Sequence, residues 1–325
     1  MWLFGAPFAR YSAATCALGR QPRTSRGLLT LTMSNPRIPY QMFSERPLLA
    51  PLDGKPIMVH VVVNVESWPF DQAMPRAALP APHGKSPIPD VGNFSWVEYG
   101  MRVGLPRLLQ MLRRRGVPAS TFMNAACADV YPAAAQAMLE AEWEFVGHGW
   151  VQKSLQFEED ESAVIERSLQ RLQQLTGKAT RGWFGPGSGE SFDTPDLLSA
   201  AGIDWLADWF VDDLPCWMDT TSGRILAMPY TLELNDVPLY AIQQLPSDEM
   251  LRRLEMTLRT FDSEGLIQPR VLTLALHPHL MGVAHRADVL GQCLDLLLAR
   301  NDTTFVTGSQ IADWYVGAEQ AAIAR

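Results

Sequence analysis

The sequence predicts an α/β fold in which helices cover a mostly parallel β-sheet. From about residue 55, apolar runs of strand length alternate with amphipathic runs of helical length. Residues 57–65, IMVHVVVNV, are largely β-branched and almost free of polar residues, as expected for a strand buried on both faces. Repeated βα units over roughly 250 residues indicate a barrel or a doubly wound sheet with right-handed crossovers.

The first 44 residues differ in composition from the rest of the chain. They contain five arginines and no Asp or Glu, a composition similar to that of a transit peptide. They lack the apolar core and small-residue cleavage site of a secretory signal. We expect residues 1–44 to be a disordered extension or a mis-called start, with Met33 as the true initiator, in preference to a targeting segment. Residues 45–325 are then expected to form one domain.

Proline and glycine mark the ends of the expected helices. Pro106 opens one helix and Gly116 follows it, while Pro195 and Gly202 bracket another. Residues 69–95 contain six prolines and no periodicity, which predicts a long loop with a functional role. The expected strands are 57–65, 119–124, 143–146, 203–207, 271–276 and 304–307, and the expected helices are 106–115, 131–141, 160–175, 194–201, 250–261, 287–299 and 309 onward.

Three polar residues come at or just past the ends of apolar runs. Glu66 follows the first strand, His148 lies between two glycines, and His277 follows the run 271–276. The carboxyl ends of parallel strands meet at the active-site rim, so these groups are expected to assemble there. A carboxylate at a buried strand end has a shiftable pKa and suits general-base work, although a structural carboxylate bonded to backbone is an equal alternative for Glu66.

Other loop residues allow a functional and a structural interpretation. Arg181 lies in a Gly/Pro/aromatic loop and either clamps a substrate or pairs at the surface. Asp213 either orients a group or forms a turn. Trp150 and Trp183 suit a flat or sugar-like ligand, or core packing. His279, separated from His277 by one proline, completes an HxH pair that is a weak metal signal without a third ligand.

Composition limits the classes of function. The net charge is −8 without a basic stripe, so we expect no nucleic-acid partner. No apolar run reaches the roughly 18 residues that a membrane span needs. The four cysteines are far apart, which favours a reducing, cytoplasmic location over a disulfide or thiolate site. We expect a small-molecule substrate and a homo-oligomer.

In order along the chain, four segments resemble the motifs of the polysaccharide deacetylase superfamily, also called the NodB homology domain. The resemblance covers about residues 56–316 and implies a distorted (β/α) barrel. Glu66 falls at the position of the catalytic base, and Ser67 and Gln152 fall at positions where metal ligands are expected. The matching segments are 64–68 (NVESW), 148–152 (HGWVQ), 181–186 (RGWFGP) and 276–277 (LH).

Further patterns resemble the allantoinase-like branch of that superfamily. This branch is associated with purine catabolism and hydrolyses a ring amide of allantoin without the usual metal. Ser67 stands where the branch usually has a second glutamate, and Trp68 where it usually has glycine. The patterns are Asn-x-Glu at 64–66, His-Gly-Trp at 148–150, DDLPCW at 212–217, PYTLELND at 229–236 and LHPH at 276–279.

Together the residues and the resemblance predict a hydrolase of non-peptide carbon–nitrogen bonds that acts on a small cyclic amide or ureide without a cofactor. Glu66 is expected to activate water and His277 to act as the acid, with Arg181 as a further catalytic residue. The expected substrate-binding residues are His148, Trp150, Trp183, Asp213 and His279.

Two alternatives stay open. The first is a metal-dependent N-acetyl sugar deacetylase, in keeping with the superfamily's place in carbohydrate metabolism, with zinc or another divalent ion held by Glu66, His148 and His279. The second is a catalytically inactive binding homologue.

Overall fold

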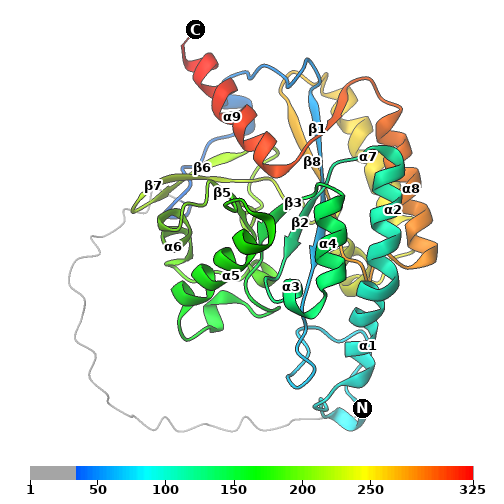
Figure 1. The fold of residues 1–325 in the computed structure, drawn as a ribbon. Coiled ribbons are helices and arrows are strands. Elements are labelled where there is room, and N and C mark those ends of the chain that lie inside the picture. Colours follow the sequence, from blue (N-terminus) through cyan, green and yellow to red (C-terminus); the bar gives the residue numbers. More distant parts are fainter. Residues whose placement is uncertain (1–33, 325) are drawn as a thin grey trace, which may run out of the picture.

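The computed structural model describes residues 34–324, and β1 is an interior strand of its sheet, paired on both edges (Figure 1). The run IMVHVVVNV forms β1 (Ile57–Val65) with every residue buried, as the lack of polar breaks predicts. β1 pairs in parallel with β8 (Arg270–Leu276), with β2 (Ser120–Met123) at its carboxyl end and with β9 (Thr303–Phe305) at its amino end.

The sheet curls into a distorted (β/α) barrel, which confirms the predicted fold class. The strand order is β6-β7-β5-β4-β3-β2-β1-β8, and every pairing among these strands is parallel except β6–β7. After β7, residues 228–235 run from β5 to β8, with the amide of Met228 bonded to Leu206 and that of Ala275 bonded to Leu234. The remaining strands are β3 (Glu144–Gly147), β4 (Gly182–Trp183), β5 (Trp205–Leu206), β6 (Cys216–Thr220) and β7 (Gly223–Ala227).

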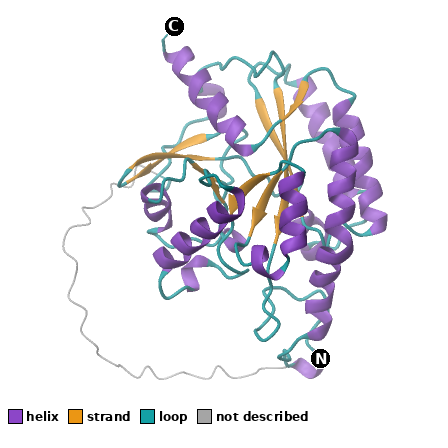
Figure 2. Ribbon diagram, in the orientation of Figure 1, coloured by secondary structure: helices purple, strands orange, loops and turns teal. Residues whose placement is uncertain are grey.

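Helices cover the outside of the curled sheet (Figure 2). Val61 and Val63 of β1 pack outward in a cluster that includes Leu108 of α2, while Met58 and Val62 pack inward among aromatic side chains. Because successive side chains of a strand point to opposite faces, β1 contributes one set to the helix-facing layer and the other to the barrel interior. The helices are α1 (Val91–Tyr99), α2 (Leu105–Arg115), α3 (Cys127–Val130), α4 (Pro132–Glu140), α5 (Glu161–Thr176), α6 (Thr194–Ala200), α7 (Glu249–Ser263), α8 (Ala284–Leu298) and α9 (Gly308–Ile323).

The predicted elements occur with small shifts at their ends, and several short ones are additional. The expected helix 131–141 is divided into α3 and α4 before Pro132. α1 begins inside the expected loop 69–95, capped by the Asp90 side chain. β4, β6 and β7 were not predicted, because none of them coincides with a continuous apolar run of strand length. Among the described residues, no helix is long and apolar enough to cross a bilayer.

Residues 34–44, which we expected to belong to the extension, contact the domain. Arg37 donates two hydrogen bonds to the Asp196 carboxylate, at 3.0 and 2.8 Å. Ile38 is buried in a cluster beside β5 and β7. The domain therefore begins earlier than residue 45. The prediction for residues 1–33 concerns a segment outside the described residues.

Candidate active site

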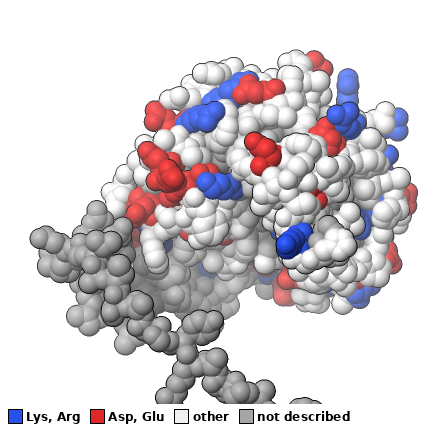
Figure 3. Space-filling view, turned by 90° about the horizontal axis from the view of Figure 1, so that it is seen from below, with Lys and Arg blue, Asp and Glu red and all other residues white. Residues whose placement is uncertain are grey.

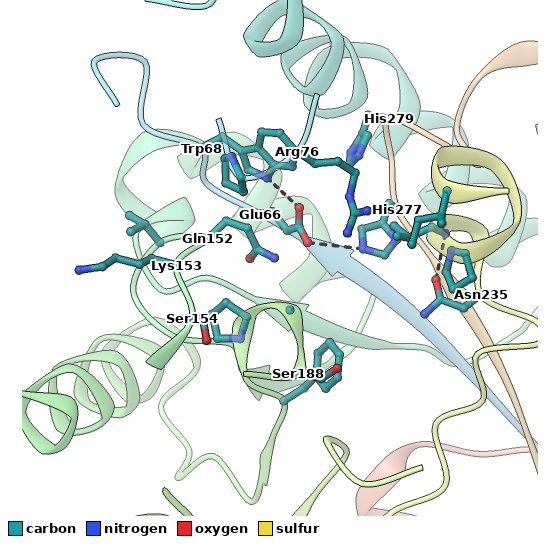
Figure 4. Close-up of a pocket in the computed structure, with 18 of the residues that line it drawn as sticks. Glu66, Trp68, Arg76, Gln152, Lys153, Ser154, Ser188, Asn235, His277 and His279 are labelled. Atoms are coloured by element: carbon teal, nitrogen blue, oxygen red, sulfur yellow. Dashed lines mark hydrogen bonds and ion pairs between the residues drawn. The ribbon is translucent and has the colours of Figure 1, made fainter. Parts of the chain in front are cut away.

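The site lies in a cavity of about 670 Å³ at the carboxyl end of β1 (Figure 4). Glu66, the first residue after β1, is 6% exposed and lines this cavity. Trp68 donates its indole N–H to Glu66 Oε2 at 2.7 Å. The other oxygen, Oε1, lies 3.4 Å from His277 Nε2 and 3.8 Å from His148 Nε2. The three groups expected at the strand ends are therefore brought together.

Glu66 is held as a carboxylate. Burial raises its pKa, but the interactions with His148 and His277, and the positive charge of His277, outweigh burial and lower the pKa well below its usual range. A fixed carboxylate that lines a cavity and has an oxygen between two imidazoles can bind water and accept its proton.

His277 is paired with Asp236, a residue 41 positions away in the sequence. The ring Nδ1 lies 2.6 Å from Asp236 Oδ1, and the backbone N–H of His277 donates to Oδ2 at 2.6 Å. Burial of the ring lowers its pKa, but the charge and hydrogen bond of Asp236, followed by those of Glu66, raise the pKa of His277 to about 10. The ring is therefore an imidazolium at neutral pH, with Nε2 directed toward Glu66.

His148 is fixed from behind by the backbone. Its Nδ1 lies 2.6 Å from the carbonyl oxygen of Phe184, so this nitrogen carries a proton. Its ring stacks on Phe184 with 4° between the planes. Within the described residues Nε2 is buried without a hydrogen-bond partner, and it is the nitrogen that faces Glu66. His148 is fully buried and does not line the cavity, so its structural role is to face and orient Glu66.

Two asparagines align the strand ends beneath these groups. Asn124, just past β2, accepts from the backbone N–H of Ser67 and donates to the carbonyl of His148. Asn64 donates to the carbonyl of Leu276 at 3.3 Å. These side chains tie the ends of β1, β3 and β8, so they fix Glu66, His148 and His277 relative to one another.

His279 lines the cavity as a neutral ring. It packs edge-on against Trp68 and Trp96, with ring centroids 5.9 and 4.6 Å away. Burial, the charge of His277 and, less strongly, the charge of Arg76 lower its pKa to about 3, against the smaller opposing effect of Glu66. His279 can therefore donate or accept one hydrogen bond but carries no charge at neutral pH.

Comparison with known proteins gives one family. Residues 96–206 match the family model for polysaccharide deacetylases. A Schizosaccharomyces pombe protein assigned to the polysaccharide deacetylases is 26% identical over 265 residues, which is 75% of this chain and 82% of that protein. These matches relate the chain to the polysaccharide deacetylase superfamily. The prediction from its motifs is thereby confirmed.

Solved structures of other proteins have folds similar to the distorted barrel of this chain. A probable polysaccharide deacetylase from Pseudomonas aeruginosa superposes with a TM-score of 0.72 at 25% identity, covering 84% of this chain and 95% of its own. PuuE allantoinase superposes with a TM-score of 0.75 at 23% identity, covering 85% and 95%. The predicted class of carbon–nitrogen hydrolase agrees with these names.

Five of the expected site residues do not line the cavity: Arg181, Asp213, Trp150, Trp183 and His148, although His148 still faces Glu66. Arg181 precedes β4, so it lies at the amino end of the sheet, where it pairs with Asp204 and Asp313 at 2.6 and 2.7 Å. Asp213 is also at the amino end, because its carbonyl accepts from Val271 near the start of β8. Both residues lie at the wrong end of the strands for the proposed roles.

The two tryptophans serve packing instead. Trp183 is fully buried in β4, in a core cluster with Leu198 and Ile203. Trp150 is covered by the Arg167 guanidinium, 3.4 Å from the ring centroid. Neither residue lines the cavity of Glu66, so the structure gives no support to the expectation that they bind substrate there.

Sequence reasoning missed three residues that contact or face the reacting groups. Asp236 ends the pattern PYTLELND, and Trp68 stands where the allantoinase-like branch usually has glycine; neither position indicated these contacts. Arg76 lies in the long loop 69–95, which was expected to be functional without any particular residue being singled out. Asp236 and Arg76 are brought beside His277 and Glu66 only by tertiary structure.

The residues present do not fit a catalytic metal. Among residues 34–324, no three His, Cys, Asp or Glu side chains are arranged to hold a metal ion. Ser67 and Gln152 stand at the family's ligand positions, and a catalytic zinc usually needs about three protein ligands. Asp236 is occupied with His277, which leaves Glu66 as the free carboxylate of the cavity.

Proposed function

We propose that the chain is a hydrolase that opens a carbon–nitrogen bond in a small cyclic amide or ureide. The arrangement of Glu66, His277 and Asp236 supports this proposal. A carboxylate and an imidazolium 3.4 Å apart, both facing one cavity, supply the base and the acid that amide hydrolysis requires. Asp236 keeps the acid charged.

The reaction would proceed by direct attack of water. Glu66 accepts a proton as the water oxygen bonds to the carbonyl carbon. The carbon–nitrogen bond then breaks, and the leaving nitrogen takes the Nε2 proton of His277. Asp236 orients the ring through Nδ1 and stabilises its charge. Proton transfer from Glu66 to His277 restores both groups, so no other reactant is consumed.

The size of the cavity favours a small substrate. About 670 Å³ is within the roughly 300–1,000 Å³ that small-molecule sites occupy. Its rim carries the exposed apolar side chains Phe157, Phe210, Leu232 and Ile242, which suit a compact ring. Figure 3 shows, on the face seen from below, acidic and basic side chains interspersed with uncharged surface and no continuous basic patch. The name of PuuE allantoinase, whose fold is similar, suggests that cyclic ureides be tried first.

The test is a hydrolysis screen of cyclic ureides, cyclic imides and N-acetyl compounds, each with and without a chelator. We expect turnover of a cyclic compound that survives chelation. In Glu66→Gln, kcat should fall by about 10²- to 10⁴-fold, because the amide cannot accept the proton of water. Glutamine preserves the shape and an acceptor for Trp68, so the melting temperature should change little. Near-full activity in Glu66→Gln would contradict the role of this carboxylate.

A second candidate is deacetylation of an N-acetyl sugar. The match of residues 96–206 to the polysaccharide deacetylase model favours it. The same base and acid would cleave an acetamide. Activity confined to N-acetyl compounds and abolished by chelation would select this alternative over the first.

A further inference from the structure

An unpaired cation lies beside the reacting groups of the cavity. Of the residues that line it, Arg76 and Lys153 are the only Lys or Arg. Lys153 is neutralised by Glu158 at 2.7 Å. Among the described residues, no hydrogen-bond or ion-pair partner of Arg76 is found. Figure 4 shows the Arg76 side chain reaching into the cavity, with its guanidinium beside His277 and Glu66.

The surroundings of Arg76 leave its donors free. The carboxylate of Glu66 is contacted by Trp68 on one oxygen and faced by His277 and His148 on the other. Asp236 is bonded to His277. A guanidinium has five N–H donors and cannot lose its charge, so an acceptor must come from water or from the bound molecule.

We infer that Arg76 stabilises the negative charge that develops on the substrate oxygen when water attacks the carbonyl. This inference rests on the proposed hydrolysis. The new bond joins the water oxygen to carbon, the π electrons move to the carbonyl oxygen, and Glu66 takes the proton. Arg76 transfers nothing; it donates hydrogen bonds to the oxyanion.

Charge balance supports this role. Before attack, Glu66 and Asp236 are negative while His277 and Arg76 are positive. After attack, Glu66 is neutral and the negative charge has moved to the substrate oxygen. The charge of Arg76 therefore keeps the site neutral throughout, and it interacts most strongly with the state in which the charge is on the substrate.

Kinetics of Arg76 variants provide the first test. Removal of one oxyanion donor usually lowers kcat by about 10²- to 10³-fold, so Arg76→Met should lose this much with KM changed by less than a few-fold. Arg76→Lys should keep part of the rate, and added guanidinium ion should partly restore Arg76→Ala. The matched control is Arg114→Met, which removes an exposed positive charge at the far end of α2 and should behave like the wild type. A rise in KM at constant kcat would show ground-state binding and overturn the inference.

A binding measurement separates this inference from the choice of substrate. In Glu66→Gln, the neutral side chain imitates Glu66 after it has accepted a proton. Methylphosphonate, a tetrahedral oxyanion, should bind this variant, and calorimetry should show at least tenfold weaker binding when Arg76→Met is added. Addition of Arg114→Met should leave the affinity unchanged. If methylphosphonate binds equally with and without Arg76, or does not bind, the inference fails even where hydrolysis is found. If binding depends on Arg76 while no amide is hydrolysed, the anion site stands and the proposed function falls.

Discussion

At the scale of single residues, the charge of His277 depends on a partner that the sequence does not reveal. An unperturbed histidine titrates near 6.5, and this is the value expected for His277 from sequence alone. Asp236, 41 residues away, holds Nδ1 at 2.6 Å and raises the pKa to about 10. A pH profile is therefore the most direct report on this pair.

The acid must be protonated to act, so kcat should fall as pH rises through about 10 in the wild type. In Asp236→Asn the charge that raises the pKa is lost, so the falling limb should move toward 6.5 and kcat at neutral pH should drop. Steady-state rates between pH 5 and 10.5 measure both limbs. His279→Ala is the control and should keep the alkaline limb, because His279 is already neutral. A limb that does not move in Asp236→Asn would exclude this pair as the acid.

At the scale of elements, the site was predictable where an apolar run reveals a strand and unpredictable where no such run marks one. β1 is nine buried residues long, so the position of Glu66 at its carboxyl end could be read directly. β4 is only Gly182–Trp183, and nothing in its sequence indicates that Arg181 precedes the strand instead of following it. For the same reason Asp213 was expected at the carboxyl ends of the strands, whereas it lies at their amino ends. Periodicity thus identifies strands, but a two-residue strand has none.

The close approach of β3 and β4 makes Gly147 a second constraint on His148. A methyl group at residue 147 would overlap the buried ring of Trp183. Gly147→Ala should therefore destabilise the fold by about 1–3 kcal/mol and lower kcat by displacing His148. Gly317, exposed in α9 with open space around its Cβ position, is the matched control. Gly317→Ala should raise stability by roughly 0.5–1 kcal/mol. Thermal unfolding of both variants checks the contrast, and equal shifts would refute it.

The segment before residue 45 should contribute to stability as an added element. A chain that begins at Met33 should match the full chain in melting temperature and activity. A chain that begins at Arg46 loses the Arg37–Asp196 pair and the buried Ile38, so its melting temperature should fall by several degrees. Differential scanning calorimetry of the two chains decides between these outcomes. A drop already present in the chain from Met33 would mean that residues 1–32 also contact the domain.

At the scale of the whole molecule, the alternation of apolar and amphipathic runs predicts the fold class. It does not predict how the barrel is closed. The segment 228–235 has no regular pattern in its sequence. It nevertheless closes the barrel by lying between β5 and β8, and Asp236 follows it directly. The location and the expected oligomeric state also remain predictions, because they concern surroundings and partners that a single chain does not contain. The buried carboxyl groups, in contrast, make the stability of the folded chain depend on pH in a way that can be measured.

Asp208 accepts two hydrogen bonds from the backbone N–H of Gly185, but burial and the charge of Glu190 raise its pKa well above the usual range. The folded protein therefore keeps a proton that the unfolded chain releases above about pH 4, so this group costs stability as pH rises toward its folded pKa. Asp208→Asn keeps an acceptor and cannot ionise. Its melting temperature relative to wild type should be higher at pH 8 than at pH 5. The same difference at both values would exclude Asp208 as the source.

Closure of the barrel by residues 228–235 also completes the chemistry of the site. The carboxylate of Glu66 follows the interior strand β1, whereas Asp236 follows the irregular segment that bonds to β8. A partly assembled barrel could possess most of its helices and strands and still have an uncharged, unaligned His277. Such a species would resemble the native enzyme in its secondary structure and yet be unable to cleave a bond. Catalytic competence is in this sense a property of the closed barrel, because the acid is charged and aligned only when segment 228–235 brings Asp236 to His277.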